Sequence, residues 1–128
     1  MALDGRFAKA LRKKARRGFG GYPVATVAFY GPDDKRASKV AVGIVIAEGE
    51  EVAEMKRWFS DQGDVRQDAG VQRAVLEFVR TWNVHSVAMA DGIIGCPHEE
   101  GIDYPDGQTC PQCPFWANRD RWTGKIVR

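Results

Sequence analysis

Four side chains that could bind a metal ion lie within eighteen residues near the C-terminal end of the sequence. Cys96, His98, Cys110 and Cys113 include every cysteine of the 128-residue chain and one of its two histidines. Zinc prefers four thiolate or imidazole ligands in a tetrahedron. Cys110 and Cys113 are separated by two residues, a spacing typical of a tight turn whose side chains converge, and Cys96 and His98 offer a second pair. The pattern predicts a Zn²⁺ site made of these four residues.

The first ligand pair leaves alternatives open. Only one residue separates Cys96 from His98, which is tighter than the two to four residues usual in zinc sites. His85 or Asp103 could therefore supply a ligand in place of one member of this pair. His85 lies in a stretch of alternating apolar residues, which favours a histidine packed in a strand. The cysteines could also be ordinary buried thiols beside a surface histidine.

The predicted zinc has a structural role rather than a catalytic one. Zinc in small Cys/His sites contributes about 10–16 kcal/mol of apparent binding free energy, and whole domains are stable by only about 5–15 kcal/mol. A deaminase-like or hydrolase-like enzyme is an alternative, since His98-Glu99-Glu100 contains the His-x-Glu of zinc nucleobase deaminases and Glu100 would be its acid/base. Thr109, however, replaces the proline of that motif, and the interval to Cys110 is too short for the intervening strand and helix. Glu99 and Glu100 otherwise form a solvated charged pair.

Three segments of the sequence have the residue pattern of β-strands. Residues 24–30 and 39–46 are rich in Val and Ile, and Gly31-Pro32-Asp33-Asp34 begins the turn between them, so they predict a hairpin. Residues 84–90 predict a further short strand.

Helical spacing occurs in three segments. Residues 3–17 predict a helix that ends at Gly18, and residues 52–59 predict a short one. The clearest pattern covers residues 71–82, with Asp68 as its N-cap and Asn83 as its end. Together the elements predict an α+β fold, in which a small sheet carries two to three helices on one face and precedes an irregular zinc-bound segment.

The N-terminal helix is strongly basic. The first 20 residues hold seven basic side chains and one acidic residue, although the net charge of the whole chain is only +2. Such a helix could contact phosphates, and C-terminal aromatic and basic residues could stack on bases. The candidate nucleic-acid-binding residues are Lys9, Arg12, Lys13, Lys14, Arg16, Arg17, Trp116, Arg119 and Arg121.

Two motifs resemble a small family of uncharacterised bacterial proteins. The shared motifs are Gly-Cys-Pro-His-Glu-Glu-Gly-x-Asp-Tyr-Pro and Cys-Pro-x-Cys-Pro-Phe-Trp, here starting at Gly95 and Cys110, with an upstream Gly-Tyr-Pro-Val-Ala-Thr at residues 21–26. The resemblance covers residues 18–124. It implies the zinc site and no particular activity.

Composition and charge set the remaining expectations. Apolar content of 44% and charged content of 28% are those of a globular protein, and the longest apolar run is too short to cross a bilayer. We expect a basic helical arm and hinge at residues 1–20, an α+β core at 21–92 and a zinc-binding segment at 93–128. Without an export signal, the cysteines favour a cytoplasmic location. The favoured function is an interaction or adaptor module for a protein partner, and nucleic-acid binding is the first alternative.

Overall fold

A computed structural model of the chain describes residues 4–108 and 110–117. The described residues form two α-helices, four strands and one short 3-10 helix. In chain order these are α1 (Asp4–Arg16), β1 (Val24–Tyr30), β2 (Lys39–Val45), β3 (Glu54–Phe59), α2 (Ala69–Thr81), β4 (Ser86–Ile93) and η1 (Pro114–Trp116). The predicted α+β class is confirmed.

The four strands form a single mixed sheet in the order β3-β2-β1-β4. β1 and β2 pair antiparallel, with Val24 opposite Val45 and Tyr30 opposite Lys39, so the predicted hairpin is confirmed. β3 adds antiparallel to β2, whereas β4 lies parallel to β1 at the other edge. Because β4 runs parallel to β1, its carboxyl end lies beside the start of the β1–β2 turn. The chain therefore enters its cysteine-rich segment next to that turn.

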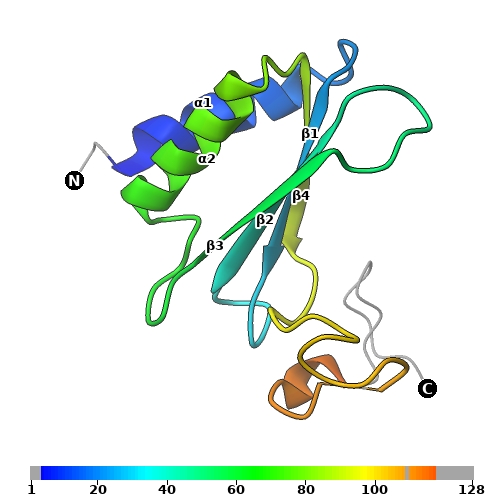
Figure 1. The fold of residues 1–128 in the computed structure, drawn as a ribbon. Helices are drawn as coiled ribbons and strands as arrows, with labels where there is room; N and C mark the ends of the chain where they lie inside the picture. The colour runs from blue at the N-terminus through cyan, green and yellow to red at the C-terminus, as the bar shows by residue number, and fades with distance from the viewer. Residues whose placement is uncertain (1–3, 109, 118–128) are drawn as a thin grey trace.

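Both helices cover the same face of the sheet (Figure 1). The core buried between the helices and the sheet is almost entirely aliphatic. In it, the side chains on one face of β1 and β2 pack against the apolar stripe of α2. Its largest fully buried side chains are Leu11, Val27, Val40, Val42, Ile44, Val65, Val75 and Val79. No helix in the described part of the chain is long and apolar enough to cross a membrane.

Helix α1 is docked rather than free. Leu11 is 0% exposed and belongs to the main core, and the half-buried Phe7 packs against that core. α1 contacts both α2 and β4. The helix ends where predicted, because Gly18 adopts a positive φ of 73° that favours glycine. α2 likewise begins where predicted, since the Asp68 carboxylate accepts a hydrogen bond from the Val71 amide at 3.0 Å.

The prediction of a short helix over residues 52–59 is wrong, because this segment forms strand β3. Met55 and Phe59 are four positions apart, a spacing that fits one face of a helix and also one face of a strand. The intervening Trp58 points to the other face, where its ring lies 5.9 Å from that of Phe78 in an edge-to-face contact. Pairing with β2 and this aromatic contact favour the strand, although the local spacing also suits a helix.

The Asp64 carboxylate is one of the groups that join the loop before α2 to the β1–β2 turn. Asp64 accepts hydrogen bonds from the Ala37 amide at 3.1 Å and from two nitrogens of the Arg66 guanidinium at 2.9 and 2.7 Å. Burial opposes ionisation of Asp64, but the hydrogen bonds from Arg66 and Ala37 outweigh it and lower its pKa. A carboxyl whose pKa is lowered on folding stabilises the fold above its ordinary pKa, and that stabilisation is lost as the pH falls through the folded pKa.

We predict that Asp64→Asn lowers the free energy of unfolding at pH 7 by about 1–3 kcal/mol, because buried donors lose a charged acceptor. The difference from the wild-type protein should shrink at a second, acidic pH below the folded pKa of Asp64, where the wild-type carboxyl is also protonated. Urea unfolding of both proteins at each pH measures this. Asp61→Asn, an exposed change in the same loop, is the control. An equal loss at both pH values would contradict the assignment.

Candidate metal centre

The segment after β4 forms a compact set of turns at the end of the sheet, beside the β1–β2 turn (Figure 1). Backbone hydrogen bonds connect it to β1, since the Gly31 amide donates to the Gly95 carbonyl at 2.9 Å. The Trp116 indole Nε1 donates to the Gly31 carbonyl at 2.8 Å. A Cβ at position 31 would overlap the Arg36 carbonyl, so glycine is required at this junction. Both ends of the segment therefore form hydrogen bonds with Gly31 at the start of the β1–β2 turn.

A charged cluster attaches the same segment to β2 and β3. The Lys39 ammonium is almost fully buried and donates to the Pro97 carbonyl at 2.9 Å, with the Glu99 carboxylate at 3.5 Å. The Arg57 Nε donates to the same Glu99 oxygen at 2.6 Å. The Lys39 nitrogen also lies 5.3 Å from the centroid of the Tyr30 ring. Burying an ammonium is costly unless it is paired, so these contacts fix the chain next to His98 against the sheet.

Two short turns present the cysteines. The Cys113 amide donates to the Cys110 carbonyl at 3.3 Å and closes the turn of the second pair. In the first pair, the His98 amide donates to the Cys96 sulfur at 3.3 Å. The chain between the pairs has one isolated β-bridge and is otherwise held by turn hydrogen bonds, including that from the Gly107 amide to the Glu100 carboxylate at 2.7 Å. Its small core consists mainly of the cysteine side chains with Tyr104 and Trp116.

The structure brings the four predicted ligands together. The ligand atoms of Cys96, His98, Cys110 and Cys113 all lie within 4.8 Å of one another. The three sulfur atoms surround one nitrogen, the Nδ1 of His98. Their distances from it are 3.2 Å for Cys96, 3.4 Å for Cys110 and 3.5 Å for Cys113. The cluster could therefore hold a metal ion such as zinc.

These distances match the edges of a zinc tetrahedron. Zn–S bonds of about 2.3 Å and Zn–N bonds of about 2.0–2.1 Å place sulfur and nitrogen about 3.6 Å apart at the tetrahedral angle. Hydrogen bonding does not account for the arrangement equally well. An imidazole nitrogen carries one proton or one lone pair, so it can satisfy one sulfur but not three. A central cation satisfies all four ligand atoms together.

Burial of the sulfurs suits a metal ligand set. Cys110 is 4% exposed and Cys113 is 2% exposed. Burial raises the pKa of the Cys96 and Cys113 thiols, and Cys110 raises both further, whereas a hydrogen bond with Cys96 partly lowers that of Cys113. Without a metal, these groups therefore retain their protons at neutral pH. Metal binding must displace those protons, which couples binding to pH.

Neither alternative ligand joins the cluster. His85 immediately precedes β4, whereas the cysteine segment follows that strand, so a strand of roughly 25 Å separates them. The Asp103 carboxylate instead accepts a hydrogen bond from the Glu99 amide at 2.7 Å. Glu100, the candidate acid/base, accepts the turn hydrogen bond from Gly107. Both carboxylates stabilise the loop between the two ligand pairs.

The candidate nucleic-acid-binding residues within the described part of the chain do not form one surface. Lys9, Arg12, Lys13, Arg16 and Arg17 are exposed and Lys14 is half-buried, all at or just after the docked helix α1. Trp116 belongs to η1, which lies at the opposite end of the molecule from α1 (Figure 1), and its indole nitrogen donates to the Gly31 carbonyl. Arg119 and Arg121 lie outside the described residues.

The ion pairs that attach the cysteine-rich segment to β2 and β3 were not predicted from the sequence. The prediction that Glu99 and Glu100 form a solvated pair is wrong for Glu99, which contacts Lys39 and Arg57. The available signal was Lys39 itself, a charged residue at the start of a strand that is otherwise apolar. Its partner could not be identified, because β3 was not predicted.

Comparison of the chain with protein-family models, with curated proteins and with solved structures finds no match.

We predict that Cys110→Ser lowers the bound metal from one ion per chain to nearly none and unfolds at least the segment after Gly95. Serine oxygen is a poor replacement for a thiolate ligand, and the small core around the cluster has little else to hold it. Metal analysis and hydrogen exchange of residues 95–117 measure the two effects. Gln112→Ser, an exposed change in the same turn, should alter neither. Full metal retention with an unchanged melting curve would rule out Cys110 as a ligand.

Proposed function

We propose that this protein binds one Zn²⁺ through Cys96, His98, Cys110 and Cys113, and that the zinc is structural. The observation that carries the proposal is the convergence of three sulfurs on His98 Nδ1 at 3.2–3.5 Å. Three thiolates and one imidazole form a closed ligand set that suits zinc among the common divalent ions. When bound, the ion supplies the cross-link that holds the two turns together.

Four protein ligands argue against a catalytic centre. A catalytic zinc keeps three protein ligands and an open position for water, whereas structural sites have all four positions filled by the protein. The residue that a deaminase would use as acid/base, Glu100, is committed to a hydrogen bond with the Gly107 amide. The ligand set and this contact favour a binding protein over a zinc enzyme.

We propose further that the zinc segment and β3 together form a docking surface for a protein partner. A groove of about 550 Å³ runs between them and is lined by Phe59, Arg57, Pro97 and Gln112, among others. Phe59 is 60% exposed at this groove. Ile102 is 77% exposed on the loop between the ligand pairs. An exposed aromatic residue that lines a groove is typical of protein interfaces, where buried aromatic anchors supply most of the affinity.

The docking surface can be tested by affinity capture with quantitative mass spectrometry. We predict that Phe59→Ser loses at least one protein that the wild-type chain retains, because the aromatic anchor is removed. Val52→Ser, which changes another exposed apolar residue outside the groove, should keep that protein. Retention of the same proteins by both variants, or equal losses from both, would contradict a docking surface centred on Phe59.

A nucleic-acid-binding function remains a second proposal, supported by the exposed cations of the α1 region. Docking of α1 through Leu11 leaves five cations at residues 9–17 exposed. If all five contacted phosphates of duplex DNA, log affinity would fall with log salt at a slope of roughly −4.5.

The salt dependence of DNA binding tests this proposal. We predict that Lys9→Gln combined with Lys13→Gln reduces the slope by about two, as expected for two lost phosphate contacts. Fluorescence anisotropy with a labelled duplex gives the slope. Lys35→Gln combined with Lys56→Gln removes the same charge outside α1 and should leave the slope unchanged. Equal slopes for both double variants would show that α1 is not the contact.

A further inference from the structure

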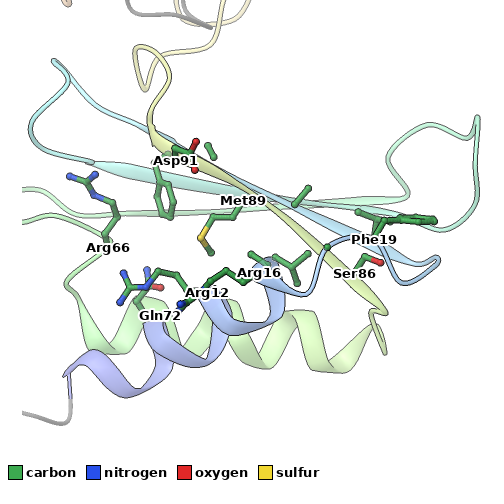
Figure 2. Close-up of a pocket in the computed structure, with 15 residues that line it drawn as sticks. Arg12, Arg16, Phe19, Arg66, Gln72, Ser86, Met89 and Asp91 are labelled. Atoms are coloured by element: carbon green, nitrogen blue, oxygen red, sulfur yellow. The ribbon is translucent and has the colours of Figure 1, made fainter.

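A second site lies on the helix-covered side of the sheet, away from the zinc cluster. A cavity of about 700 Å³ opens between α1 and strands β1 and β4. Figure 2 shows it with the sheet on one side and the helices on the other. Its volume falls within the range of about 300–1,000 Å³ that is usual for small-molecule sites. No residue of this cavity belongs to the metal cluster or to the groove beside β3.

One end of the cavity is cationic. Arg12 and Arg16 come from α1 and Arg66 from the loop before α2, and Figure 2 places Arg12, Arg66 and the amide of Gln72 at the same end. The Arg66 charge is already matched by its two hydrogen bonds to Asp64. Arg12 and Arg16 form no ion pair with any residue within the described ranges. The unmatched positive charge therefore belongs to α1.

The middle of the cavity is apolar. Met89 projects into it between the cationic end and Phe19 (Figure 2). Phe29 and Val87 complete this wall, and each is about 5% exposed or less. The one carboxylate of the lining, Asp91, lies on the β4 side and not among the arginines of α1. An anionic group is therefore best placed against α1, with its uncharged body along Met89.

We propose that this cavity binds a small organic anion that has an aromatic or aliphatic body. Its carboxylate, sulfonate or phosphate group pairs with Arg12 and Arg16, because guanidinium groups bind planar and tetrahedral oxyanions through two hydrogen bonds. Its apolar body covers Met89 and Phe29, which removes their remaining apolar surface from water. The site is independent of the zinc and of the protein-docking groove.

The test uses a matched pair of fluorescent probes with the full-length, zinc-loaded protein. 8-Anilinonaphthalene-1-sulfonate carries an anionic group on an aromatic body, and N-phenyl-1-naphthylamine has the same body without the charge. We expect the sulfonate to bind with one-to-one stoichiometry. Arg12→Gln should weaken its binding about tenfold, the effect of one lost charge-assisted hydrogen bond. The uncharged probe should bind wild type and Arg12→Gln with equal affinity.

Two further variants distinguish probe binding in the cavity from probe binding to the surrounding surface. Lys13→Gln removes the same charge from α1 at a position that does not line the cavity, and it should change sulfonate affinity by less than about twofold. Met89→Trp fills the apolar middle and should weaken both probes while unfolding remains cooperative. Equal effects of Arg12→Gln and Lys13→Gln would overturn the proposal, because they would show that only surface charge attracts the probe. Unchanged sulfonate binding by a folded Met89→Trp protein would overturn it equally.

Discussion

The approach of three cysteine sulfurs to a single imidazole nitrogen is the interaction on which the C-terminal part of the structure depends. Each sulfur lies 3.2–3.5 Å from His98 Nδ1, although that nitrogen can form only one conventional hydrogen bond. The segment that carries these residues has turns and one isolated bridge instead of a regular strand ladder. Its core is small and contains the cysteines themselves. A cation at the centre of the cluster, as proposed above, would satisfy all four ligand atoms together and cross-link the two turns.

The contacts between this segment and the sheet extend the effect of the cluster to the rest of the molecule. Glu99 follows His98 directly and pairs with Lys39 and Arg57, which belong to adjacent strands. At the other end, Trp116 lies three residues beyond Cys113 and donates to Gly31. A change in the positions of the ligands would therefore move the groove in which Phe59 is exposed. Through this coupling, the proposed structural zinc would influence the proposed docking surface directly.

Residue spacing was sufficient to predict which four potential metal ligands come together and most of the elements that enclose the core. The cysteine and histidine positions are local in sequence, and the hairpin and α2 have strong local patterns, so little tertiary information was needed. Strand β3 was missed because the spacing of Met55 and Phe59 suits a helix as well as a strand, and only pairing with β2 distinguishes them. The pairing of Glu99 with Lys39 was missed for a related reason, since it joins residues 60 positions apart. The cavity beneath Met89 depends on how α1 docks, which a pattern of apolar residues does not specify.

X-ray absorption at the zinc edge, recorded on the zinc-loaded full-length protein, tests the central claim most directly. The closed site predicts three sulfur neighbours at about 2.3 Å and one nitrogen neighbour at about 2.0–2.1 Å. An oxygen neighbour from water in place of a sulfur or the nitrogen would contradict a closed structural site. Failure of the protein to retain zinc through gel filtration would contradict the metal centre itself.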